Sequence, residues 1–159
     1  MSRFRILREI WLPQPRERVF EFFADPRNLE KLTPAWLRFE VLDPESIQMD
    51  AGASIDYRLR LRGIPLRWRS QIVVWDPPRR FVDIQVRGPY QEWAHEHRFE
   101  SQSDGTLVID RVDYTVPGGR LVNRLFVRRD LEKIFDYRTA ALRSIFVRGD
   151  ARAGPANPP

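Results

Sequence analysis

Apolar and polar residues alternate along most of the middle of the chain, which is the pattern of strands that bury one face. Residues that favour tight turns separate the alternating runs, at Gly63, at Asp76-Pro77-Pro78 and at Ser103-Asp104-Gly105. The pattern predicts an early strand, a second strand or turn, and five further strands, over about residues 3–12, 39–47, 55–61, 64–74, 81–86, 90–101 and 106–116.

Helical spacing of apolar residues occurs on both sides of this region. After Pro15, apolar residues recur every three or four positions up to Ala24, and Asp25-Pro26 favours the start of a second short helix to Leu32. A long amphipathic helix is expected from about Arg120 to Arg148. This order of elements is typical of an α+β domain. The long helix must bury its apolar side against the concave face of a curved sheet, and such a wrap leaves room for a cavity.

Length and composition fit a single compact unit. The chain has 159 residues, and we expect one domain over 1–149 and a disordered tail over 150–159, rich in proline, glycine and alanine. Hydrophobic residues make up 42% and charged residues 31%, as in soluble globular proteins. The sequence has no apolar run of about 18 residues and no signal-peptide core. We therefore expect no membrane span and a cytoplasmic location.

Charge and cysteine content limit the classes of partner and cofactor that the sequence predicts. The 27 basic and 22 acidic residues give a net charge of +5 and are interspersed, without a basic block or a nucleic-acid motif. We therefore expect no nucleic-acid partner. Because the chain has no cysteine, it has no disulfide and no thiolate metal site. No cofactor is indicated, and the oligomeric state is left open.

Both histidines of the protein lie in one strand-like stretch, two residues apart. Alternation places Trp93, His95, His97 and Phe99 on one face of this strand, and charged residues on the other. Because the aromatic face of a single domain turns inward, two imidazoles are expected in the interior.

Arg138 is the second polar residue predicted at an apolar surface. Its helical neighbours are Ile134, Phe135, Ala141 and Leu142, so it falls near the middle of the apolar side of the long helix. A buried guanidinium needs a carboxylate, a carbonyl or an anionic ligand.

The neighbouring strands offer partners. Asp110 and Tyr114 share a face with the valines of residues 106–116, so they face inward if those valines do. Whether Arg138 pairs with Asp110 or contacts a ligand stays open at this point. The alternation over 81–86 also leaves open the facing of Asp83 and Gln85.

The predicted interior set consists of His95, His97, Asp110, Tyr114 and Arg138, walled by Tyr57, Trp68, Trp93, Phe99 and Phe135. In one interpretation these are hydrogen-bonded core residues with Arg138 paired to Asp110. In a second they line a pocket, where Arg138 or a histidine anchors the polar end of a mostly apolar molecule.

In a third interpretation the set is catalytic. His95 or His97 is then a general base oriented by Asp110. Developing negative charge is stabilised by Tyr114 or Arg138. The two histidines with a carboxylate could also hold zinc, but without cysteine or a third histidine we expect no metal site.

At these residues the chain resembles the START-like SRPBCC superfamily, which includes polyketide cyclases, dehydratases, lipid-transfer proteins and plant hormone receptors. The resemblance covers about Arg3 to Arg148. It rests on the order of elements, the helix start Pro15-Arg16-Glu17-Arg18-Val19-Phe20 and the Asp25-Pro26 boundary. Segments similar to a bacterial branch of the superfamily are Leu32-Thr33-Pro34, residues 81–90, Trp93-Ala94-His95-Glu96-His97-Arg98-Phe99, residues 110–114 and Ile134-Phe135-Asp136-Tyr137-Arg138.

The resemblance implies a helix-grip fold, in which a seven-stranded antiparallel sheet wraps around the long helix and encloses a hydrophobic cavity. It transfers no catalytic residues, because the superfamily includes both binding proteins and enzymes. We expect the protein to bind a small hydrophobic or amphipathic molecule, with an anionic group as one option. The alternatives are a cyclase or dehydratase acting on an aromatic or polyketide-like substrate through His95 and His97, and a protein-interaction module.

Overall fold

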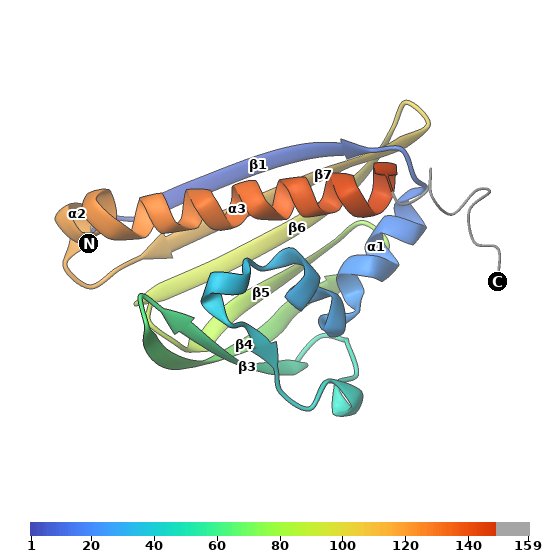
Figure 1. Ribbon diagram of the computed structural model, residues 1–159. Coiled ribbons are helices and arrows are strands. Elements are labelled where there is room, and N and C mark those ends of the chain that lie inside the picture. Colours follow the sequence, from blue (N-terminus) through green and yellow to red (C-terminus); the bar gives the residue numbers. More distant parts are fainter. Residues whose placement is uncertain (149–159) are drawn as a thin grey trace.

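The computed structural model describes residues 1–148 and contains one antiparallel sheet. The strand order is β1-β7-β6-β5-β4-β3-β2, so the first strand lies beside the last (Figure 1). The strands are β1 (Phe4–Leu12), β2 (Glu40–Val41), β3 (Ser54–Leu61), β4 (Ile64–Asp76), β5 (Arg80–Arg87), β6 (Glu92–Gln102) and β7 (Gly105–Thr115).

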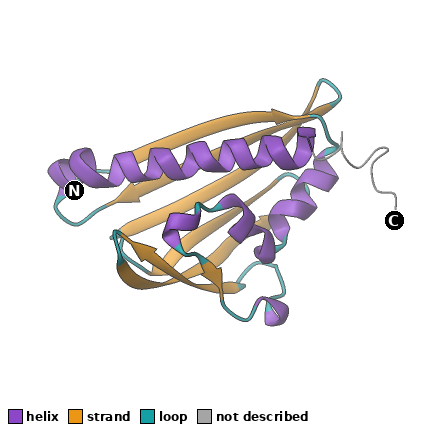
Figure 2. Cartoon of the chain, in the orientation of Figure 1, coloured by secondary structure: helices purple, strands orange, loops and turns teal. Residues whose placement is uncertain are grey.

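The helices lie on one side of this sheet, and the longest one crosses its concave face (Figure 2). The N-terminal helices are α1 (Arg16–Ala24) and the 3-10 helices η1 (Pro26–Leu32), η2 (Ala35–Leu37) and η3 (Pro44–Ser46). The C-terminal helix is continuous through α2 (Gly119–Val122), the π-helical turn η4 (Asn123–Val127), α3 (Arg128–Arg143) and the π-helical turn η5 (Ser144–Arg148).

The α+β helix-grip fold expected from the sequence is confirmed by this arrangement. Two details differ. The strand or turn expected over 39–47 contains only the two residues of β2, because the proline-led turns η2 and η3 take up the chain on either side. The long helix also contains two π-helical turns, η4 and η5, where a regular α-helix was expected. The tail expected over 150–159 lies outside the described residues.

Two hairpins turn through pairs of residues with positive φ. Arg62 and Gly63 have φ angles of 50° and 79° between β3 and β4, and Ser103 and Asp104 have 46° and 60° between β6 and β7. Such left-handed pairs match the twist of the strands they join. The long hairpins therefore stay in register over most of their length, which aligns the inward-facing residues of neighbouring strands.

The buried core has two parts. One gathers around α1 and the end of α3, with Phe20, Phe23, Phe99 and Leu142. The other gathers near the start of α3, with Phe135 among its members. A cavity of about 160 Å³ lies where the two parts meet and is lined by both. No helix within residues 1–148 is long and apolar enough to cross a membrane.

Candidate functional site

The register of β5 against β6 decides which side of β5 faces the interior. Phe81 is paired with His97, and Asp83 is paired with His95. The Phe81 ring stacks on the His97 ring, with centroids 4.2 Å apart and planes 19° apart. Asp83 therefore faces the interior, which settles the alternative that the sequence left open.

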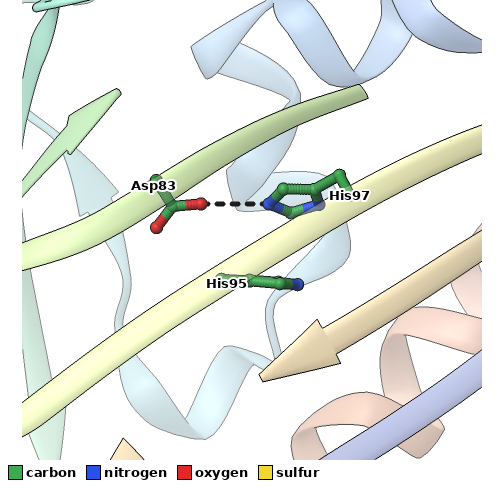
Figure 3. A group of neighbouring side chains, drawn as sticks. All are labelled: Asp83, His95 and His97. Atoms are coloured by element: carbon green, nitrogen blue, oxygen red, sulfur yellow. Dashed lines mark hydrogen bonds and ion pairs between the residues drawn. The ribbon is translucent and has the colours of Figure 1, made fainter. Parts of the chain in front are cut away.

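The histidines and two carboxylates form one buried network (Figure 3). Nε2 of His97 lies 3.0 Å from Oδ2 of Asp83, and Nε2 of His95 lies 3.0 Å from Oδ1 of Asp110. Nδ1 of His97 is 2.9 Å from the same Asp110 oxygen, but its direction does not suit a hydrogen bond, so this contact is ionic. His97 thus lies between two carboxylates.

These contacts give the two histidines different proton affinities. Burial lowers the pKa of His97, but the close contacts with Asp110 and Asp83 outweigh it and leave the pKa raised. Burial and the nearby charge of His97 lower the pKa of His95 to about 4. For a carboxyl group burial acts in the other direction and raises the pKa of Asp110. The contacts with His95 and His97 outweigh burial and hold the pKa of Asp110 well below 3.8. His97 therefore holds its proton to a higher pH than an ordinary histidine, whereas His95, with a pKa of about 4, is neutral at pH 7.

Arg138 enters the cavity from α3 without a partner of its own. Its Nε and Nη1 atoms are buried, and within residues 1–148 neither has a hydrogen-bond partner. Its guanidinium carbon lies 5.3 Å from the centroid of the Phe135 ring. The expected alternative of an Arg138–Asp110 pair does not occur, because Asp110 is held by the two histidines. Burial raises the pKa of Asp83, but its hydrogen bond with His97, the charges of the two histidines and, as the smallest contribution, the charge of Arg138 leave this pKa lowered.

The remainder of the lining is mostly apolar. Its aromatic residues from β3, β4, the β5–β6 connection, β6 and α3 include Tyr57, Trp68, Tyr90, Trp93 and Phe135. Its polar side chains, tyrosines aside, are Thr33, Ser70, Asp83, His95, His97 and Arg138. An apolar cavity with a few polar groups on one side is the usual design of a site for small molecules.

The structure brings most of the predicted set together around the cavity, but three of its members lie elsewhere. Asp110 is behind the histidines and reaches the lining only through them. Tyr114 donates a hydrogen bond to Asn123 (2.9 Å) in the second part of the core. Phe99 packs against Phe20 and Phe23. Their roles in ligand binding remain predictions.

Sequence reasoning missed several lining residues, among them Ser70 and Tyr90. Ser70 accepts a hydrogen bond from Trp68 (3.1 Å) and donates a longer one to Asp83 (3.5 Å). It is a small polar residue on the apolar side of β4, between Trp68 and Ile72, and this break in the pattern was a usable signal. Tyr90 was expected at the start of a strand over 90–101, where alternation puts it on the face opposite to Trp93 and His95. It lies instead in the connection between β5 and β6, because β6 starts at Glu92.

Asp83, His95 and His97 also offer ligand atoms within 4.8 Å of one another. The two imidazole rings, however, lie face to face, with centroids 3.7 Å apart and planes inclined by 32°. A metal ion lies in the plane of each imidazole at about 2.1 Å from nitrogen. At this inclination and separation, the two rings would have to rotate before both could direct a lone pair at one ion.

A curved sheet that grips a long helix around an apolar cavity defines a START-like, Bet v1-like protein of the helix-grip class. Over residues 12–143 the sequence matches the family described as polyketide cyclase/dehydrase and lipid transport. The chain belongs to this family, and the resemblance to the SRPBCC superfamily is confirmed. No curated protein matches the sequence.

Solved structures share the fold at low sequence identity. Zhui aromatase/cyclase from Streptomyces sp. R1128 is 17% identical with a TM-score of 0.67, covering 98% of this chain and 99% of that one. Protein CV1439 from Chromobacterium violaceum is 17% identical with a TM-score of 0.69, covering 92% and 98%. Ginseng major latex-like protein 151 from Panax ginseng is 12% identical with a TM-score of 0.65, covering 91% and 98%.

Proposed function

We propose that the protein binds a compact amphipathic anion, with the apolar part of the ligand in the cavity and its carboxylate on Arg138. The observation that carries this proposal is the pair of buried guanidinium nitrogens, Nε and Nη1, which have no hydrogen-bond partner in the described part of the chain. Leaving a buried donor unsatisfied costs about 1–3 kcal/mol, and more when the group is charged. A planar carboxylate accepts two parallel hydrogen bonds from a guanidinium, through Nη2 together with either Nε or Nη1, and so removes this cost for one of the two nitrogens.

The size of the cavity limits the ligand. Its volume is about 160 Å³, and an apolar cavity of about 150 Å³ is known to hold benzene. The aromatic side chains of Trp68 and Trp93 meet edge to face in the lining, with ring centroids 5.1 Å apart. A monocyclic aromatic carboxylate such as benzoate therefore fits the unchanged cavity, and a longer molecule requires the cavity to widen.

Isothermal titration with benzoate and with neutral benzyl alcohol tests the proposal. We expect benzoate to bind more tightly, and Arg138→Leu to weaken benzoate binding at least tenfold, since a charged hydrogen bond contributes about 1.5–3 kcal/mol. Arg138→Lys keeps the positive charge but cannot donate two parallel hydrogen bonds to one carboxylate, so this variant should retain only part of the affinity for benzoate. Arg143→Leu, at the exposed end of the same helix, serves as the control.

Two results would contradict anion binding. One is wild-type affinity for benzoate in the Arg138→Leu variant. The other is no binding of benzoate or of larger aromatic carboxylates together with a large loss of stability in that variant. The second result would assign Arg138 a structural role, because loss of a structural partner is seen in the free energy of unfolding.

A second candidate function is catalysis, and the orientation of His95 favours it. Because a carboxylate only accepts, Nε2 of His95 carries the proton toward Asp110, and Nδ1 holds the lone pair. His95 lines the cavity and can take a proton from a carbon next to a carbonyl, while Arg138 stabilises the enolate oxygen. Its pKa of about 4 makes it a weak base, so catalysis ranks second.

Acetoacetate in heavy water is a suitable probe of this chemistry. We expect wild-type protein to exchange its acidic C–H protons at least a hundredfold faster than His95→Gln, because a positioned base contributes about 10²–10⁴-fold. The rate should fall as the pH drops toward 4, where His95 takes up its proton. Equal exchange rates in both proteins, measured by NMR with the variant still folded, would remove His95 as a base.

A further inference from the structure

The start of the C-terminal helix presents an exposed face that is apolar and basic without acidic residues. Leu121, Leu125 and Phe126 are 61%, 49% and 45% exposed. The other exposed side chains of residues 120–129 are the arginines Arg120, Arg124 and Arg129. We name these six residues the docking face. Neither core cluster includes any of them.

The turn between β3 and β4 lies beside the docking face. Arg62 in this turn donates to both carboxylate oxygens of Asp130, at 3.1 and 3.0 Å. Its guanidinium also lies 4.9 Å from the centroid of the Phe126 ring. Ile64, two residues further on, is 63% exposed. These contacts join turn and helix into one end of the molecule, where Figure 1 shows the β3–β4 turn beneath the start of the helix.

Positive charge continues along the same hairpin. A surface cleft here is lined by Arg38, Arg58, Arg60 and Arg67. Arg58 and Arg67 are paired directly across β3 and β4, and like charges opposite each other destabilise a sheet. Among these four arginines, only Arg58 has a carboxylate partner within residues 1–148, Glu40 at 2.9 Å. An anionic partner surface would offset this repulsion.

We propose that this end of the protein docks on an anionic membrane surface. Leucine and phenylalanine interleaved with arginine suit the boundary between headgroups and acyl chains, where apolar side chains insert and cations meet anionic lipids. A nucleic acid offers no acyl layer for Leu121 and Leu125. Leu61 and Leu131 line the cavity and adjoin Arg62 and Asp130 in sequence, so the cavity wall reaches the docking end. The proposal goes beyond cavity binding and does not depend on it.

Co-sedimentation with lipid vesicles tests the docking without any cavity ligand. We expect the protein to bind vesicles of phosphatidylcholine mixed with phosphatidylglycerol, to bind pure phosphatidylcholine much more weakly, and to lose binding as salt is added. Arg124→Gln should lower the partition coefficient about fivefold. Leu121→Ser should lower it about tenfold or more, because an inserted leucine is removed.

Matched controls separate the docking face from general surface effects. Arg143→Gln makes the same charge change 14 positions beyond Arg129 on the helix, about 21 Å away. Leu7→Ser makes the same apolar change at a leucine that is 50% exposed on β1. Both controls should bind vesicles as the wild type does. All four changes are at exposed positions, and circular dichroism checks that each variant folds.

Three results would overturn the proposal. They are equal binding to both kinds of vesicle, equal loss of binding in the face variants and their controls, and no vesicle binding at all. In the last case, light scattering that shows a dimer lost in Leu121→Ser would assign the docking face to a second copy of the chain. Titration with soluble benzoate is independent of these results, so failure of docking is distinguishable from failure of cavity binding.

Discussion

His95 and His97 lie two positions apart on one strand, yet their surroundings favour opposite protonation states. Both are buried, so burial alone does not separate them. The difference arises because His97 contacts two carboxylates, whereas His95 hydrogen-bonds to one and stacks on the charged His97 ring. In this network the two aspartates have lowered pKa values, His97 holds its proton more tightly than His95 does, and Arg138 supplies a positive charge nearby.

The proton affinity of His95 predicts a loss of stability in acid. Below pH 6.5 the unfolded chain protonates this residue, while the folded protein does so only near its pKa of about 4. The unfolded state therefore binds more protons across this window, and the free energy of unfolding falls by up to about 3 kcal/mol as pH drops from 6.5 to 4. Urea unfolding of His95→Gln should show a much smaller loss over the same range.

His97 has the opposite effect on how the free energy of unfolding changes with pH, and its variant tests the alkaline side of the profile. Because its folded pKa is raised, its stabilisation is complete below pH 6.5 and is lost as pH rises through the folded value. His97→Gln should therefore flatten the alkaline side of the stability profile, and it should reduce the acid slope of His95 only in part, because burial as well as the charge of His97 lowers the pKa of His95. An unchanged acid slope in His95→Gln would refute the assignment of the neutral histidine.

For single residues, the sequence predicted which side chains face the interior better than it predicted their contact partners. Strand alternation placed His95, His97 and Asp110 inward, as the structure has them. It could not pair Asp83 with His97, because that contact depends on the register between β5 and β6, which is a nonlocal property. For the same reason, sequence reasoning could not decide that Arg138 would be left without a carboxylate.

Among the elements, the β3–β4 turn and the C-terminal helix are linked by Arg62 and Asp130. These residues are 68 positions apart in the chain and form two hydrogen bonds. The side chain of Arg62 is half exposed, whereas that of Asp130 is largely buried. An ion pair of this kind contributes at most about 1 kcal/mol, so it restrains the opening of the turn more than it stabilises the fold.

Removal of this link should loosen the turn locally. In Arg62→Gln we expect amide hydrogen exchange over residues 59–66 to be about fivefold faster, corresponding to about 1 kcal/mol, with little change in global stability. Arg79→Gln breaks a similarly bidentate pair with Asp76 at the far end of β4 and serves as the control. If exchange over 59–66 is the same in both variants, the link does not hold the turn.

Element boundaries were predictable where the residue pattern is long. The strands β3 to β7 and the helix α1 follow from alternation, helical spacing and turn residues within a few positions. The short strand β2 and the π-helical turn η4 were not predictable, because neither leaves a periodic pattern in the sequence. In η4 the side chain of Asn123 is buried and accepts the hydrogen bond from Tyr114, a tertiary contact with no local signal.

For the whole molecule, the order of strands and helices was enough to predict an α+β domain with the long helix on the concave face of a curved sheet, and the helix-grip fold followed from the resemblance to the superfamily. Neither the volume of the cavity nor the side on which arginines gather could be predicted in this way. The volume depends on the distance between the sheet and the helix, and the position of the arginines depends on which loop contacts which end of the helix. Both are set by the packing of the complete core.

The pairing of β1 with β7 has a consequence for how the protein is made. Phe4 lies opposite Tyr114, so the first strand finds its partner only after more than 100 further residues. At about 5–20 residues per second, ribosomal synthesis leaves β1 unpaired for roughly 5–20 s, while the hairpins of β3 to β6 need only sequence neighbours. We therefore expect the newly made chain to assemble its middle first and to add β1 only once β7 has been made.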